Sequence, residues 1–280
     1  MTRLIDQLKA GEFISAPGVF DPLSARVAEQ SGASALYMTG YGVSASLLGK
    51  PDAGLVSYRE MVDRVRSICE VTEAPLIADG DTGFGGLANV RQAVQGYEAA
   101  GASAIQIEDQ EYPKRCGHTK NRKVISAEDM KKKLEIACES RASEDFLIVA
   151  RTDARTEHGL DEALRRSEAY IKAGADILFL ESPESIQEMR IITERFPEIP
   201  KLANMVGGGK TPVLPDAELR TLGYQIVIHP VYLLGAAVSG MRAAMQTLQS
   251  DGTETPSAAT LEDLNMLVDF PAVWALDERA

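Results

Sequence analysis

The chain has 280 residues, and its 29 basic and 41 acidic side chains give a formal net charge of −12. This balance argues against nucleic-acid or anionic-membrane partners, although a locally positive site can still bind an anionic small molecule. No apolar run approaches the roughly 18 residues that a membrane-spanning helix needs. The three cysteines are widely spaced and suggest no disulfide framework, so we expect a reducing, cytoplasmic compartment.

Eight short apolar runs alternate with amphipathic segments along the chain. The runs lie at 13–16, 35–39, 75–81, 104–109, 146–152, 177–181, 201–205 and 225–229. Helix formers fill the segments near 20–31, 57–71, 87–100, 126–141, 160–173, 184–195, 214–222 and 231–249. Strict alternation predicts a parallel sheet covered by helices, and eight units predict a (β/α)8 TIM-type barrel, with a doubly wound open sheet as the alternative.

The predicted barrel occupies residues 1–250, and residues 251–280 form a helical extension. A polar stretch with Gly252 and Pro256 marks the boundary between them. The extension has apolar side chains to bury, among them Leu264, Phe270 and Trp274. We expect it to pack either on its own barrel or on a neighbouring subunit.

Polar side chains end the predicted strands, where a barrel enzyme carries its chemistry. Asp79 and Asp81 end the third run, Glu108 ends the fourth, and Asp52 lies in the loop after the second. Carboxylates without clustered histidine or cysteine ligands suit a hard cation that keeps several waters, so Mg²⁺ fits best and Mn²⁺ is an alternative. Helix caps and exposed charges are the other explanation. However, Asp79 and Asp81 flank Gly80 at an apolar run, a costly place for unpaired charge.

A polar loop after the fourth run holds Lys114, Arg115, Cys116 and His118 within five positions. A thiol beside cations has a lowered pKa and can exchange a proton near neutral pH, although a surface loop with an incidental cysteine is the alternative. The interval between the ends of the fourth and fifth runs is longer than its neighbours, and the surplus falls in this loop. An oversized loop over the active face predicts a lid.

The glycine-rich segment 207–211 resembles the end of a phosphate-binding P-loop. Asn204 stands where the first glycine of that motif is required, so we reject a nucleotide site. The loop after the seventh run can still bind a carboxylate or phosphate through its backbone amides. Cys69, Cys138 and His158 lie in or beside helices, and we interpret them as structural.

Together these motifs resemble the isocitrate lyase / phosphoenolpyruvate mutase superfamily over residues 1–250. They are Tyr-Met-Thr-Gly-Tyr-Gly at 37–42, Gly-Lys-Pro-Asp at 49–52, Asp-Gly-Asp-Thr-Gly at 79–83, Ile-Glu-Asp-Gln at 107–110, Pro-Lys-Arg-Cys-Gly-His at 113–118, Ala-Arg-Thr-Asp-Ala at 150–154, Asn204 and Lys-Thr-Pro at 210–212. The cysteine loop is similar to that of the lyase branch. The resemblance implies a barrel, Mg²⁺, a mobile cysteine loop, and homotetramers (dimers of dimers) that exchange the C-terminal helix between subunits.

The resemblance also implies roles for individual residues around a small di- or tricarboxylate substrate. Mg²⁺ is expected on Asp79 and, partly through water, on Asp52, Asp81 and Glu108. Cys116 is expected to protonate the second product, with Lys114, Arg115 and His118 tuning its thiol. Tyr37 is the candidate base, with Arg151 and Glu181 nearby. The implied substrate-binding residues are Thr39, Gly40, Tyr41, Arg115, Gly117, Asn204 and Thr211.

The segment Asn-Met-Val-Gly-Gly-Gly from Asn204 is closest to the 2,3-dimethylmalate lyase and petal death group, although Gly207 stands where that group has Glu. This implies cleavage of a 2-alkylmalate to pyruvate and propionate in a retro-Claisen (aldol-type) step. The alternatives are 2-methylisocitrate cleavage to pyruvate and succinate, hydrolysis of oxaloacetate to oxalate and acetate, and a non-catalytic barrel that binds a dicarboxylate or a partner. A proton donor on a lid counts against the non-catalytic barrel.

Overall fold

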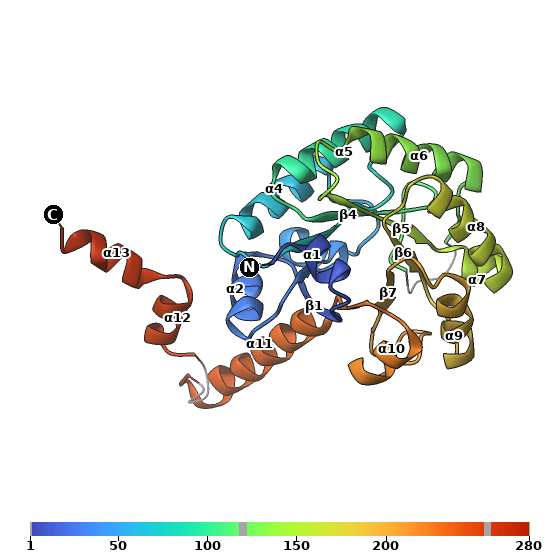
Figure 1. The fold of residues 1–280 in the computed structure, drawn as a ribbon. Coiled ribbons are helices and arrows are strands. Elements are labelled where there is room, and N and C mark those ends of the chain that lie inside the picture. The colour runs from blue at the N-terminus through green and yellow to red at the C-terminus, as the bar shows by residue number, and fades with distance from the viewer. Residues whose placement is uncertain (1, 118–121, 255–258, 280) are drawn as a thin grey trace.

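The computed structural model describes residues 2–117, 122–254 and 259–279. Eight parallel strands pair in sequence order, and pairing of the first with the eighth closes them into one barrel (Figure 1). The strands are β1 (Ile14–Val19), β2 (Leu36–Met38), β3 (Leu76–Asp79), β4 (Ala104–Glu108), β5 (Leu147–Thr152), β6 (Ile177–Leu180), β7 (Lys201–Asn204) and β8 (Ile226–His229). The predicted barrel is confirmed, and the open sheet is wrong because the sheet has no free edge.

Helices surround the strands and continue beyond them. They are α1 (Leu4–Lys9), α2 (Pro22–Gln30), α3 (Gly40–Val43), the π-helix η1 (Ser44–Leu48), α4 (Tyr58–Cys69), α5 (Leu87–Ala99), α6 (Ala127–Ser140), α7 (Ala154–His158), α8 (Leu160–Lys172), α9 (Ile186–Arg195), α10 (Asp216–Leu222), α11 (Tyr232–Asp251), α12 (Leu261–Leu267) and α13 (Phe270–Asp277). None of the helices in the described ranges is long and apolar enough to span a membrane.

Two apolar layers hold the barrel together. Alternate strand residues such as Ile77, Val149 and Phe179 fill its interior, and Leu4 of α1 joins them. The side chain of Gln7, also in α1, donates to the carbonyl of Ser34 (3.1 Å). This short helix therefore closes the amino-terminal end of the barrel. A larger layer packs between the strands and the surrounding helices. The carboxyl ends of the strands are left for the functional cavity.

The C-terminal extension leaves the barrel. In Figure 1, α11 runs outward and α13 projects well beyond the barrel wall. Neither α12 nor α13 has a buried residue, and Trp274 is 47% exposed. The structure therefore does not pack α13 on its own barrel. Exchange with a neighbouring subunit stays a prediction.

Candidate active site

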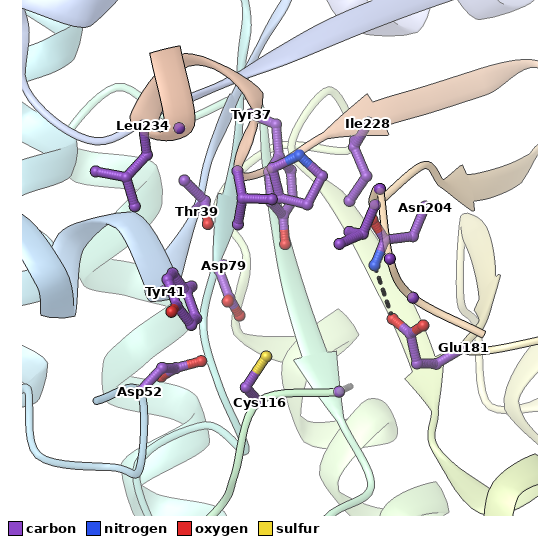
Figure 2. A pocket seen from close by; sticks show the side chains of 18 of the residues that line it. Tyr37, Thr39, Tyr41, Asp52, Asp79, Cys116, Glu181, Asn204, Ile228 and Leu234 are labelled. Carbon is purple, nitrogen blue, oxygen red and sulfur yellow. Dashed lines mark hydrogen bonds between the residues drawn. The ribbon is translucent and has the colours of Figure 1, made fainter. Parts of the chain in front are cut away.

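A cavity of about 620 Å³ opens at the carboxyl ends of the strands. Strand ends, the cysteine loop and the start of α11 form its wall (Figure 2). Most of the predicted site residues meet there: Tyr37, Thr39, Tyr41, Asp52, Asp79, Glu108, Lys114, Arg115, Cys116, Gly117, Arg151, Glu181 and Asn204. Residues at or just beyond the ends of β2 to β7, in α3, in the segment after η1 and in the cysteine loop thus converge on one space.

Three predicted residues of the described ranges lie outside this wall. Gly40 lies behind Asp79, and its amide donates to Asp79 Oδ2 (3.3 Å); a Cβ on Gly40 would be only 2.6 Å from that oxygen. Asp81 is buried and reaches the site through Lys114. Thr211 is buried, and its Oγ1 has no hydrogen-bond partner in the described part of the chain. The fourth, His118, lies outside the described residues.

Arg151 is fixed from several sides. Its Nε and Nη2 donate to the two carboxylate oxygens of Asp153, both at 3.0 Å. It also lies 3.4 Å from Glu108 Oε2 and 3.3 Å from Glu181 Oε2, and its guanidinium sits 4.9 Å above the ring of Phe179. Burial alone would lower the pKa of Arg151, but the carboxylates hold that pKa well above its usual value. Arg151 is therefore a permanent, oriented cation on the cavity wall.

Glu181 is held in place by polar neighbours. Asn204 Nδ2 donates to Glu181 Oε2 (3.0 Å; dashed line in Figure 2), and Ser182 Oγ donates to Oε1 (3.0 Å). Ser182 has a φ of +61°, a strained conformation for a residue with a side chain. Gly117 of the cysteine loop packs against the Arg151–Glu181 pair so closely that a Cβ would overlap Arg151 Nη2. The loop and this pair are thus fitted to each other.

Tyr37 is buried between polar partners. Its hydroxyl donates to Gln106 Oε1 (3.0 Å), and Gln106 Nε2 donates to Asp79 Oδ1 (3.2 Å). Burial, reinforced by Asp79, raises the pKa of Tyr37 well above its usual value, although Arg151 opposes this. The phenol is therefore protonated at neutral pH. The base role predicted for it requires ionisation, and this role stays a prediction.

Lys114 is paired with two carboxylates, and the effect predicted for it on the thiol stays a prediction. Its Nζ lies 2.6 Å from Asp52 Oδ1 and 2.5 Å from Asp81 Oδ1, and its side chain is only 3% exposed. Burial raises the pKa of Asp81, although Lys114 opposes this. Burial alone would lower the pKa of Lys114, but Asp81 and its neighbours hold it well above its usual value. Two of the four predicted metal ligands therefore hold a lysine in this structure.

The remaining carboxylates fit a hard cation by their chemistry. Within the described ranges, no three His, Cys, Asp or Glu side chains stand close enough together to hold a metal ion. Asp79 and Glu108 nevertheless both face the cavity, and Glu108 Oε1 is buried without a hydrogen-bond partner in the described structure. Mg²⁺ needs only one or two direct carboxylates because it keeps its waters. The donor set thus suits Mg²⁺ better than a soft metal.

Cys116 lies on the loop that follows β4. Its backbone amide donates to the carbonyl of Asp52 (3.2 Å), which docks the loop on the segment after η1. Figure 2 shows its sulfur directed into the cavity, across from Tyr37 and Asp79. By contrast, burial raises the pKa of Cys69 to about 11 and also raises that of Cys138, as suits structural thiols.

Sequence reasoning missed one wall of the cavity and the network behind Arg151. The missed wall is apolar and includes Val206, Ile228, Leu234 and Val238. No polar signal marked these residues, and their convergence depends on where α11 begins. Asp153 could have been suspected, because it stands two positions after Arg151 in the Ala-Arg-Thr-Asp-Ala motif.

Comparison with known proteins identifies the family. A family model described as phosphoenolpyruvate phosphomutase matches residues 5–249. The chain belongs to this family. Among its relatives, a 2,3-dimethylmalate lyase of Eubacterium barkeri is 45% identical over 99% of this chain and 94% of its own length. A 2-methylisocitrate lyase of Halalkalibacterium halodurans is 38% identical over 99% of this chain and 92% of its own.

Solved structures of phosphomutase-family members superpose closely on the barrel. A 2,3-dimethylmalate lyase has a TM-score of 0.94 at 35% identity, covering 100% of this chain and 96% of its own. An oxaloacetate acetylhydrolase with 3,3-difluorooxalacetate has a TM-score of 0.94 at 33% identity, covering 98% and 95%. A phosphonopyruvate hydrolase complex, with a TM-score of 0.89 at 30% identity over 99% and 97%, contains oxalate and Mg²⁺. The predicted superfamily is thus confirmed.

Proposed function

We propose that this protein is a Mg²⁺-dependent carbon–carbon lyase that cleaves a 2-alkylmalate, with 2,3-dimethylmalate yielding pyruvate and propionate. The observation that carries the proposal is the Cys116 thiol, which faces Tyr37 and a set of carboxylates and cations across one cavity. A protein that only binds a dicarboxylate has no need of a proton donor at that place. The relative named 2,3-dimethylmalate lyase, 45% identical along nearly the whole chain, supports the same reaction.

Asp79 and Glu108 would hold the Mg²⁺ ion, and Asp52 and Asp81 would contribute partly through water. When bound, Mg²⁺ would supply positive charge to the carboxylate and hydroxyl oxygens of the substrate. Arg151 adds a second, permanent positive charge on the same wall. The backbone amide of Tyr41, at the start of α3, is our candidate donor to the part of the substrate that becomes the 2-oxo acid, because the amides of Thr39 and Gly40 already donate to Val19 and Asp79.

The first chemical step is removal of the substrate's hydroxyl proton. Tyr37 is our proposed acceptor, on the condition that the loaded site lowers the pKa of its phenol. Arg151 and Lys114 already act in that direction, against burial and Asp79. Until it ionises, the phenol donates a hydrogen bond instead.

Loss of the hydroxyl proton drives cleavage of the bond between the second and third carbons. The electron pair of that bond moves onto the third carbon and its carboxylate, and the second carbon becomes the carbonyl of pyruvate. Arg151 stabilises the charge that develops. Cys116 then gives its proton to the third carbon, which forms propionate. The hydroxyl proton leaves to solvent and a proton from solvent resets the thiolate, so protons and charge balance.

The apolar wall supports a substrate with alkyl groups. Val206, Ile228, Leu234 and Val238 line the cavity. A third carboxylate against these side chains would lose hydration, which disfavours 2-methylisocitrate; Arg242 of α11 also lines the cavity, but it is exposed to solvent. A methyl group there gains apolar contact instead. Because the proposed donor is a thiol that must stay reduced, we place the enzyme in the cytoplasm.

We also propose that α12 and α13 pack on a second copy of the chain, in a tetramer built as a dimer of dimers. The apolar residues of α12 and α13 are exposed on the single chain, among them Leu261, Trp274 and Leu276. Exposed apolar surface of this extent is typical of an interface. A hollow between α10 and the loop after α2, lined by Phe13 and Arg220, is a candidate receiving surface.

The direct test is release of pyruvate from racemic 2,3-dimethylmalate, followed by a coupled lactate dehydrogenase assay with and without Mg²⁺. 2-Methylisocitrate is run beside it, and oxaloacetate is tested in parallel by release of oxalate. The proposal expects Mg²⁺-dependent turnover that is fastest with 2,3-dimethylmalate. Turnover of 2-methylisocitrate alone would show that the apolar wall was misinterpreted, and turnover of none of the three would refute the lyase proposal.

A further inference from the structure

The two ends of the cysteine loop are joined at its base. Gln110 and Val124 form an antiparallel bridge. On either side of it, the amide of Glu111 donates to the carbonyl of Lys123 (2.8 Å), and the amide of Ile125 donates to the carbonyl of Asp109 (2.8 Å). The residues that lead to Cys116 therefore start from a fixed point rather than from a flexible connection.

The side chain of Gln110 continues this pairing into the loop. Its Nε2 donates to the carbonyl of Arg115 (2.9 Å), and its Oε1 accepts from the amide of the same residue (3.0 Å). Gln110 is only 2% exposed. One buried amide thus takes both backbone groups of Arg115, and so fixes the main chain one residue before Cys116.

Asp153 is contacted by residues at both ends of the loop and by Arg151 of the active site. Its carboxylate receives Arg151 through two hydrogen bonds and also pairs with Arg122, which follows the loop. The Gln110 side chain lies beside the same carboxylate and helps to lower its pKa. Burial would raise the pKa of Asp153, but Arg151 and Arg122 hold it below its usual value, so this residue stays ionised.

Arg122 is itself firmly placed. It is 3% exposed, and its Nη2 donates to Thr156 Oγ1 (2.6 Å) while Nη1 pairs with Asp153. Asp153 is anchored in turn, because its amide donates to Asp109 Oδ1 (2.9 Å). A buried carboxylate held by two arginines is rigid, since moving either arginine leaves charge unpaired in a low-dielectric interior.

We propose that Gln110 and Arg122 are positioning residues that hold the Cys116 backbone and the Arg151 guanidinium in one arrangement through the shared carboxylate of Asp153. Neither residue lines the cavity. They would act on the reaction by fixing the proton donor relative to the cation that stabilises the developing charge. The catalytic part of this inference rests on the proposed lyase function, whereas its structural part does not.

The structural part predicts the reactivity of Cys116 toward iodoacetamide at pH 7.5, read by mass spectrometry of its peptide. Arg122→Met and Gln110→Leu should each raise the alkylation rate of Cys116 about tenfold, because a lost buried hydrogen bond to a charged or backbone group loosens the loop by that factor. Cys69 and Cys138 serve as internal references, because their raised pKa values keep them slow. Arg165→Met is the matched control, since it removes a surface arginine paired only with Glu162 in the described structure.

If Arg122 only stabilised the fold, its substitution would lower stability but would not change alkylation and turnover in the way described next. Arg122→Lys, which keeps the charge near Asp153, should restore most of the slow alkylation, whereas Arg122→Met should not. In turnover, Arg122→Met should lower kcat about tenfold with little change in KM, because the donor is misplaced while substrate contacts remain. If Arg122→Met does not fold, Gln110→Leu and Arg122→Lys carry the test.

The outcomes separate the two proposals. Wild-type alkylation rates in both Arg122→Met and Gln110→Leu would overturn the inference, even if the lyase reaction is confirmed. Faster alkylation in these variants, with no lyase turnover in the wild-type protein, would support the positioning network and refute the proposed function. Equal effects of Arg165→Met would also overturn it, because they would reflect loss of positive charge rather than loss of the network.

Discussion

The backbone of Gly117 lies so close to Arg151 that a Cβ at position 117 would overlap Nη2 of the guanidinium. Gly117 is thus the contact between the cysteine loop and the fixed cation of the site. A side chain there must displace either the loop or Arg151, and both carry the proposed chemistry.

Gly117→Ala should therefore lower kcat/KM for 2,3-dimethylmalate by about a hundredfold, the loss typical of a reacting group moved by about 1 Å. The melting temperature should change little, because the loop covers a cavity and not the core. Gly86→Ala is the control for turnover, since nothing lies within 4 Å of a Cβ at that exposed position and its φ of −82° suits alanine. Wild-type turnover in Gly117→Ala would show that the loop is not fitted to Arg151 during the reaction.

Mg²⁺ should partly replace the stabilising charge of Lys114, and melting temperatures should show this. Lys114→Met leaves Asp52 and Asp81 without their ammonium partner, so the melting temperature in EDTA should fall. The gain in melting temperature on adding Mg²⁺ should then exceed the wild-type gain, because the divalent cation supplies the missing charge. An equal or smaller Mg²⁺ gain in the variant would mean that the ion binds away from these carboxylates.

The pH dependence of Lys114→Met in EDTA follows from the raised pKa of Asp81. Between the unfolded value of 3.8 and the raised folded value, the folded protein binds more protons, so its stability falls as pH rises. Lys114 lowers that pKa, and its removal extends the window upward. The melting temperature of the variant should thus decline more steeply from pH 6 to 8 than that of the wild type. Parallel profiles would contradict the Lys114–Asp81 coupling.

Tyr37→Phe tests the proposed proton acceptor. If Tyr37 takes the hydroxyl proton, kcat should fall by about 10²–10⁴, the usual contribution of a general base. In the unliganded protein, absorbance titrations of the wild type and the variant should coincide up to about pH 10, the ordinary tyrosine range, because burial keeps this phenol protonated. Near-normal turnover of Tyr37→Phe would leave the phenol as a hydrogen-bond donor and move the base role elsewhere.

Removal of residues 259–280 tests the proposed subunit exchange by sedimentation velocity. The full chain should sediment as a tetramer, and the shortened chain as a smaller species, because the interface would lose the apolar residues of α12 and α13. Trp274→Lys should weaken the tetramer in the same direction. A monomeric full-length chain would contradict the proposal.

The sequence was sufficient for the barrel because each strand was a continuous apolar run and each helix a longer amphipathic one. Short elements escaped this reasoning. Residues 40–43 form α3 although they contain two glycines, because Thr39 caps the helix through its hydroxyl (3.3 Å to the amide of Gly42) and all its residues except Tyr41 are buried. α1 was missed because a six-residue helix carries too little periodicity to be recognised.

The site was predictable where function depends on position along a strand. Asp79, Glu108, Arg151 and Asn204 were found as strand ends, and strand ends necessarily meet at one rim of a barrel. The direction in which Lys114 turns was not predictable, because its partners at 52 and 81 lie far apart in sequence. Pairing of Arg122 with Asp153 depends likewise on tertiary distance, and sequence spacing gives no signal for it.

The central claim is that Cys116 delivers a proton to the carbon released by cleavage. Nuclear magnetic resonance of the products formed from 2,3-dimethylmalate in D₂O, with Mg²⁺, tests it most directly. The wild type should give equal amounts of pyruvate and propionate, with one solvent deuterium at carbon 2 of propionate. Cys116→Ser should form neither product at a comparable rate while still binding oxalate with Mg²⁺. Undiminished formation of deuterated propionate by Cys116→Ser would contradict the claim.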